Sequence, residues 1–248
     1  MNNSNRYEKA KRLVIHQPNF LPRLKVLQKI IAGDQWVVLD DVQFVIREWQ
    51  NRSRIRFLKQ PEKEFWITIP VHRPNGQKSL IKTIMILEPS RTKDNIYQSI
   101  WHAYRRSDFW DWIDEYSTTT LQYMKNDFTK ICMQSTLICL SMLGIQRPTL
   151  LSSTLNTSGR KSGKLLEICE VLNAEVYLCG SGGHSYLNEN AFRVRNIKVE
   201  FQSWLPPSFT SKDENVSWRD ISFLDFVARY GPDALKEHLT SWKSESNK

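Results

Sequence analysis

The chain has 248 residues, of which 40% are hydrophobic and 25% are charged, and its formal net charge is +9. This composition excludes a chain too polar to build a core, and the absence of any apolar run near about 18 residues excludes a membrane-spanning helix. The basic excess is typical of proteins that meet a polyanion, such as nucleic acid, a nucleotide-linked metabolite or an anionic membrane face, although it also serves plain solubility.

The first predicted elements form a strand–helix–strand unit. Residues 12–16 read as a buried strand, residues 22–34 as a helix from Pro22 to a stop at Gly33, and residues 35–41 as a second strand. Strands joined in this way pair in parallel, with a right-handed crossover. Their carboxyl ends then lie at one edge of a sheet, so we expect His16 and the pair Asp40–Asp41 to face one crevice.

The middle of the chain begins with a basic, aromatic block. Residues 44–57 interleave arginines with Phe and Trp. This pattern suits phosphates and stacked bases, and it equally suits an exposed strand whose Trp49 packs inward. Residues 64–71 and 79–87 are predicted strands with turn residues between them. Residues 90–147 are predicted to be a helical insertion of about three helices.

The last third returns to alternating helix and strand. The predicted elements are a helix at 161–174, a strand at 175–180, a glycine-rich turn and short helix at 181–192, a strand at 197–204 and helices at 220–239. We therefore expect a single α/β domain over residues 1–248. Its sheet should be mixed or mostly parallel and flanked by helices.

The cysteines and the N-terminus indicate the compartment. Cys132, Cys139, Cys169 and Cys179 form no closely spaced pair, so we expect buried free thiols and no metal site. Residues 1–12 are polar and lack the apolar core of a signal peptide. Together these features predict a cytoplasmic protein.

The first candidate for chemistry is His16, with Gln17 and Asn19 beside it. An imidazole near a carboxylate can act as a general base, and Asp40 or Asp41 would fix its tautomer. The alternative is structural: Asp41 caps the segment that follows it, and His16 bonds a nearby carbonyl.

The second candidate is the turn at 179–187. Glycines after a buried strand expose backbone N–H groups, so Gly182 and Gly183 could hold a phosphate or an oxyanion. His184 follows them directly and is a further catalytic candidate, although a serine and a histidine here make no triad without an orienting acid. The alternative is an ordinary strand-to-helix turn.

The third candidate, residues 152–166, fails as a phosphate-binding Walker loop. Ser158 stands where a glycine is needed, Leu165 follows Lys164 where Ser or Thr would bind magnesium, and no strand is predicted immediately before the loop. Lys164 remains a candidate contact for an anion, with Arg160 and Lys161. The alternative is a solvated helix start.

Several segments occur in an order typical of one bacterial family. They include IHQPNFLP (15–22), VLDDVQFVIREWQNRSRI (38–55), WITIPV (66–71), YLCGSGGHSYLNENAF (177–192) and NIKVEFQSW (196–204). The chain thus resembles the WbqC-like proteins over about residues 13–230. The family pattern falls on His16, Gln17, Pro18, Pro22, Asp40, Asp41, Gln43, Trp49, Gln50, Asn51, Arg52, Gly180, Gly183 and Tyr186. We expect substrate contacts from Gln17, Asn19, Gln43, Trp49, Asn51, Arg52 and Tyr186.

The resemblance implies a role in making sugars for bacterial surface polysaccharide (O-antigen), such as adding a glycyl group to an amino sugar. This chain departs from the family at residues 23–26, where RLKV replaces a Trp followed by Gly and aromatics, and at Cys179, where a Ser is frequent. If those aromatics line a substrate pocket, the substrate of this chain differs.

The main hypothesis is an acyl- or aminoacyltransferase that acts on a nucleotide-linked amino sugar. His16 would take the proton of the attacking amine, Gly182 and Gly183 would hold the oxyanion, and Arg52, Arg54 and Lys164 would bind the nucleotide diphosphate. The activated acyl donor would be an aminoacyl-tRNA, which makes tRNA a partner, or a thioester.

Two alternatives remain open from the residues. One is a nucleotide-dependent enzyme that activates a carboxylate or transfers a nucleotidyl group. The other is a non-catalytic protein that binds sugar or nucleic acid.

Overall fold

A five-stranded parallel sheet organises the fold in the computed structural model, which describes residues 12–204, 206–207 and 218–241. The strands lie in the order β7-β2-β1-β8-β9. Their bounds are β1 Arg12–His16, β2 Gln35–Val38, β7 Thr149–Leu151, β8 Val176–Cys179 and β9 Lys198–Phe201. The predicted α/β class with a mostly parallel sheet is confirmed.

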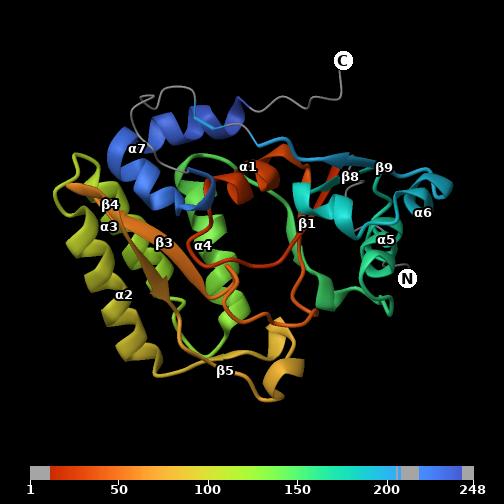
Figure 1. The fold of residues 1–248 in the computed structure, drawn as a ribbon, viewed down its shortest axis with the longest axis horizontal. Coiled ribbons are helices and arrows are strands. Elements are labelled where there is room, and N and C mark those ends of the chain that lie inside the picture. Colours follow the sequence, from red (N-terminus) through yellow and green to blue (C-terminus); the bar gives the residue numbers. More distant parts are fainter. Residues whose placement is uncertain (1–11, 205, 208–217, 242–248) are drawn as a thin grey trace, which may run out of the picture.

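Helices cover both faces of this sheet, because β1 is apolar on both sides. Val14 belongs to a large hydrophobic cluster shared with α1 (Leu24–Ala32) and α7 (Phe223–Thr240). Leu13 and Ile15 point the other way, into a smaller cluster with α5 (Ser162–Val171) and α6 (Glu189–Val194). Figure 1 shows α5 and α6 on the outer side of the sheet and α1 beneath α7.

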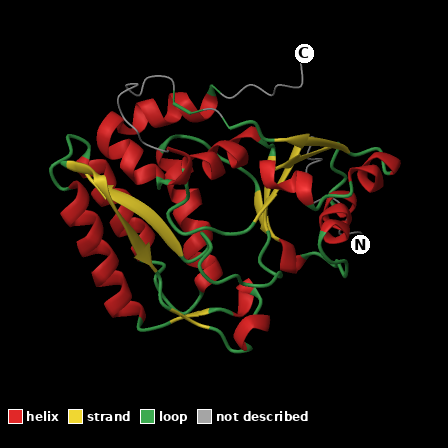
Figure 2. Cartoon of the chain, in the orientation of Figure 1, coloured by secondary structure: helices red, strands yellow, loops and turns green. Residues whose placement is uncertain are grey.

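The segment between β2 and β7 forms the other half of the molecule. It contains an antiparallel ribbon, β3 (Arg52–Phe57) with β4 (Gln60–Thr68), and a short pair, β5 (Val71–His72) with β6 (Met85–Ile86). Three helices follow: α2 (Pro89–Tyr104), α3 (Trp110–Leu121) and α4 (Phe128–Met142). Figure 2 shows the ribbon and the sheet as separate groups of strands.

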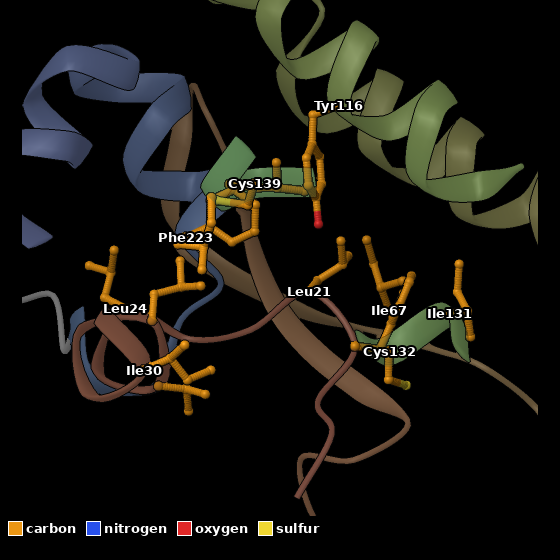
Figure 3. Packing of buried hydrophobic residues seen from close by; sticks show 14 of the residues in the cluster. Leu21, Leu24, Ile30, Ile67, Tyr116, Ile131, Cys132, Cys139 and Phe223 are labelled. Carbon is orange, nitrogen blue, oxygen red and sulfur yellow. The ribbon is translucent and has the colours of Figure 1, made fainter. Parts of the chain in front are cut away.

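The large hydrophobic cluster joins these two halves. Figure 3 shows side chains from the loop after β1, from α1, β4, α3, α4 and α7 gathered in one region: Leu21, Leu24, Ile30, Ile67, Tyr116, Ile131, Cys132, Cys139 and Phe223. Burial of this much apolar surface is the main stabilising contribution that holds the ribbon against the sheet. All four cysteines are buried and free, as the sequence predicts.

A buried ion pair adds to this connection between distant segments. Arg56 of β3 pairs with Asp225 of α7, and both side chains are almost fully buried. Asp225 also accepts hydrogen bonds from Arg229 (3.1 Å) and from the hydroxyl of Tyr104 on α2 (3.2 Å). The carboxylate therefore satisfies donors from three elements, as a buried charge requires.

Two predictions about strands are wrong. Residues 79–87 contain a 3-10 turn (Ile81–Thr83) and the two-residue strand β6 in place of the long strand that the sequence predicts. Their apolar run buries Ile81 and Ile86 without a long ladder. The second wrong prediction is that no strand precedes the loop at residues 152–166. The strand β7 ends at residue 151, but its three residues are too few to show a periodic pattern.

The prediction that α1 stops at Gly33 is confirmed, but the reason for a glycine there is packing and not backbone conformation. We expect a glycine after a helix to adopt a left-handed conformation, yet Gly33 has a φ of −97°. A Cβ at this position would lie 2.5 Å from Cγ2 of Val14. Gly33 therefore permits close packing of the helix end against β1.

None of the helices in the described part of the chain has the length and apolarity needed to cross a membrane. Residues 1–11, on which the signal-peptide prediction largely rests, lie outside the described residues.

Candidate active site at the carboxyl edge of the sheet

The carboxyl ends of β1 and β8 lie side by side. The two strands pair in parallel with Val14 opposite Leu178, so the same register continued by two residues places His16 beside Gly180. The sheet therefore unites the histidine that ends β1 with the glycine turn that follows β8. Open α/β sheets bind ligands at this edge.

His16 is held as a neutral base. Its side chain is partly buried, and Nε2 lies 3.3 Å from Oδ1 of Asn19. Asn19 Nδ2 donates to the carbonyl of Pro18 (3.1 Å), which turns Oδ1 toward the imidazole. Nε2 then carries the proton, and the lone pair of Nδ1 is left as the acceptor. Burial, followed by the charges of Lys29 and Arg23, holds the pKa of His16 well below 6.5.

The two aspartates take other partners. Asp40 accepts hydrogen bonds from the hydroxyl of Ser152 (3.0 Å) and from the backbone N–H (2.9 Å) and hydroxyl (2.7 Å) of Ser153. Asp41 forms an ion pair with Lys164 (2.7 Å). Because β7 lies on the far side of β2 from β1, the residues after β7 meet these carboxylates.

The expected orientation of the imidazole by a carboxylate therefore needs correction. Among the described residues the side-chain hydrogen bond of His16 is to Asn19, and the bonds of Asp40 and Asp41 lead toward β7 and α5. Asn19, predicted as a substrate contact, occupies the orienting position instead.

Lys164 also has an internal role in this structure. Its buried ammonium donates to Asp41 and to the hydroxyl of Thr157 (3.2 Å). The predicted contact with a substrate anion would have to compete with this ion pair.

The glycine turn forms the 3-10 segment Ser181–Ser185. Gly183 is buried, and its N–H donates to the carbonyl of Gly180 (2.8 Å), so of the two predicted oxyanion donors only the N–H of Gly182 lacks a described partner. His184 is exposed and stacks on Phe201 of β9, with ring centroids 3.5 Å apart. Tyr186 is 56% exposed.

The loop after β1 is fixed to the loop after β2 by one buried glutamine. Gln50 Nε2 donates to Oε1 of Gln17 (2.8 Å), and the Gln50 carbonyl accepts from the N–H of Phe20 (3.0 Å). Its Oε1 also accepts from the N–H of Val45 (3.1 Å). These bonds hold the segment that carries His16 and Asn19 in one conformation.

Beyond these loops lies an arginine–tryptophan stack, made of Arg23, Trp49, Arg54, Trp66 and Arg52. Arg23 lies 4.0 Å from the ring of Trp49, and Arg52 lies 4.1 Å from the ring of Trp66. The two tryptophan rings are 4.8 Å apart, and Arg54 lies 4.9 Å from the Trp66 ring. Arg52 and Arg54 thus belong to the ribbon and are grouped with aromatics, as cation–π contacts favour.

Two predicted substrate contacts bond the backbone of the protein. Asn51 Nδ2 donates to the carbonyl of Ile69 (2.9 Å), and Gln43 Nε2 donates to the carbonyl of Gln77 (2.7 Å). In this structure both amides fix loops.

A model of the WbqC-like protein family matches residues 17–237, which is nearly the whole chain. The chain belongs to the WbqC-like protein family. It is 25% identical over 193 residues to Uncharacterized protein Rv1507c of Mycobacterium tuberculosis, a match that covers 76% of this chain and 80% of that protein. No solved structure gives a significant match.

Sequence reasoning missed one residue of this WbqC-like site, Lys29 of α1. Its ammonium donates to the carbonyl of Ile15 (3.0 Å), one residue before His16. Burial lowers the pKa of Lys29 to about 8, while Cys179 acts in the opposite direction. The available signal was a lysine inside a short, strongly apolar helix. Its burial, however, depends on packing against β1 and against the residues that end β8, which is distant in sequence.

The described residues of this WbqC-like chain contain no group of three or more His, Cys, Asp or Glu side chains placed to hold a metal ion.

Proposed function

We propose that this WbqC-like protein is a transferase that adds an acyl or aminoacyl group, such as glycyl, to the amino group of a nucleotide-linked sugar for bacterial surface polysaccharide. One observation carries the proposal: a neutral, oriented imidazole stands at the ligand-binding edge of a parallel sheet, beside a glycine turn. A base that stays unprotonated at neutral pH suits the removal of a proton from an attacking amine.

The reaction assigns a role to each group. The sugar nitrogen attacks the carbonyl carbon of the donor, and Nδ1 of His16 accepts the proton that the nitrogen loses. The new N–C bond replaces the C–O bond of an aminoacyl ester or the C–S bond of a thioester. His16 returns the proton to the departing oxygen or sulfur. The N–H of Gly182 donates to the oxyanion, and Asn19 keeps the tautomer.

The test is to incubate the protein with a panel of nucleotide-linked amino sugars and with aminoacyl-tRNA or acyl thioester donors. The sugars are then analysed by mass spectrometry. We expect a product heavier by one acyl group. His16→Ala should reduce its rate by about 100-fold or more. His72→Ala removes an exposed histidine from β5 and should leave the rate unchanged.

The pH dependence gives a second readout of the same step. Because the pKa of His16 lies well below 6.5, protonation of this base should not slow the reaction between about pH 6 and pH 7. Absence of product with every sugar and donor, or equal rates for the wild type and His16→Ala, would contradict the proposal.

A second candidate function is binding of nucleic acid without catalysis, which the arginine–tryptophan stack favours. Arginines and indoles side by side suit phosphates and bases. The net charge of +9 agrees with this. Salt-sensitive tRNA binding that is lost in the double variant Arg52→Ala and Arg54→Ala, with no turnover on any sugar, would support it over the transferase.

A further inference from the structure

Lys29 is a buried cation without an anionic partner among the described residues. Its side chain is 4% exposed, and its ammonium makes one hydrogen bond, to the carbonyl of Ile15. An ammonium has three N–H donors, so two remain for another acceptor. Lysine is almost never buried to this degree unless it is paired.

The other buried lysine and arginine side chains among the described residues do have carboxylate partners. Arg56 pairs with Asp225, and Lys164 pairs with Asp41. Each is thereby compensated inside the protein, as the cost of burying a charge requires. Lys29 has no such carboxylate in the described part of the chain, so its charge calls for an acceptor from outside.

The position of the ammonium points to a ligand at the sheet edge. Nζ bonds the residue before His16, and it lies 3.9 Å from the place that a Cβ would take on Gly180. Because Gly180 has no side chain, space is left beside the ammonium at the ends of β1 and β8. This is the edge where a parallel sheet binds its ligands.

Two further cations, at the start of the same helix, strengthen the positive potential. Arg23 and Lys25 both rely on one carboxylate, Asp220, at 3.1 and 3.6 Å. Their charges, with that of Lys29, lower the pKa of His16, which places all of them within electrostatic range of the imidazole. Asp220, and Glu48 beside Arg23, offset part of this positive charge, whereas Lys29 itself has no carboxylate partner among the described residues.

We propose that Lys29 binds the diphosphate of the nucleotide-linked substrate at the edge between β1 and β8. The inference rests on the proposed function for the kind of anion. Lys29 thus takes the phosphate-binding role that the sequence assigns to Lys164. The ammonium of Lys164 is paired with Asp41, whereas two N–H donors of Lys29 remain for a phosphate oxygen. Charge-assisted bonds from Lys29 would place the sugar beside His16.

The experiment is isothermal titration of the protein with inorganic pyrophosphate and with UDP. Uridine serves as the ligand without phosphate. We expect binding of both phosphate compounds, and a loss of about tenfold or more in affinity for Lys29→Met. The control is Lys93→Met, which removes the same charge from an exposed site on α2 and should bind as the wild type does.

A measurement on the wild type covers the case in which Lys29→Met does not fold. In protein labelled with 13C at lysine Cε, saturating pyrophosphate should raise the pKa of Lys29 by about one unit or more. An unchanged pKa would overturn the inference. So would an affinity within about twofold between Lys29→Met and Lys93→Met.

These results separate the inference from the proposed function. Pyrophosphate binding requires no acyl donor. Lys29-dependent binding without any acylated product contradicts the transferase alone, whereas acylated product with unaltered pyrophosphate binding in Lys29→Met contradicts the inference alone.

Discussion

At the residue scale, the candidate site depends on two ionisable side chains, His16 and Lys29, and the charge of Lys29 acts on His16. The ammonium of Lys29 helps to keep His16 neutral, because a nearby positive charge disfavours a second one. Burial acts on both groups in the same direction. The result is a neutral imidazole near a buried cation, and we propose that the first accepts a proton and the second binds an anion.

The charge of Lys29 should make the stability of the protein depend on pH. The pKa of Lys29 is about 8 in the folded chain against 10.5 for a lysine in water, so the unfolded chain binds more protons between these values. Burial of the charged ammonium destabilises the folded chain by its full amount below about pH 8. This cost disappears as the pH rises through 10.5, because the lysine is then neutral in both states. His16 and Cys179 are the titratable groups that face this ammonium.

The measurement is urea unfolding of the wild type and Lys29→Met. From pH 7 to pH 10 the wild type should gain roughly 2–3 kcal/mol in free energy of unfolding relative to Lys29→Met. Lys93→Met, compared with the wild type in the same way, should show no such trend. A constant difference between the wild type and Lys29→Met across this range would show that Lys29 is not destabilised by burial.

At the element scale, the turn after β8 has little freedom to change. Gly183 packs directly on Cys179, because a Cβ on Gly183 would lie 2.2 Å from the sulfur of that residue and 3.2 Å from the ring of Phe201. Gly182, next to it, has nothing within 4 Å of its Cβ position. Packing therefore requires a glycine at position 183 but not at position 182, although the sequence shows the two as one pair.

This difference predicts unequal effects of alanine on stability. Gly183→Ala should lower the free energy of unfolding by about 1–3 kcal/mol, because the sulfur of Cys179 or the turn must move. Gly182→Ala should change it by about 0.5 kcal/mol or less, because its side chain meets open space. Urea unfolding of both variants checks this, and equal losses would show that packing against Cys179 is not the constraint on the turn.

At the scale of the whole molecule, local pattern predicted most of the helices and strands but not the order of the strands in the sheet. The periodicity of residues 12–41 predicts β1, α1 and β2, and their crossover brings the strand ends to one edge. The strand order is not a local property: β8, far along the chain from β1, pairs beside it, whereas β7 pairs with β2.

That order decides which residues can meet at the candidate site. His16 lies next to the glycine turn because β1 pairs with β8, and the aspartates are taken by the serines after β7 because β7 pairs with β2. The contact of Asn19 with His16 is local, since three residues separate them, whereas the burial of Lys29 follows from tertiary packing. Charge spacing in the sequence favours Asp40 and Lys164 instead.

Both proposals place the substrate at the edge between β1 and β8. The most direct test is a crystal structure of the protein with UDP bound. We expect a phosphate oxygen within about 3 Å of Nζ of Lys29, with the distal phosphate directed toward His16. A diphosphate held by Arg52, Arg54 or Lys164, with Lys29 still bonded only to Ile15, would contradict it.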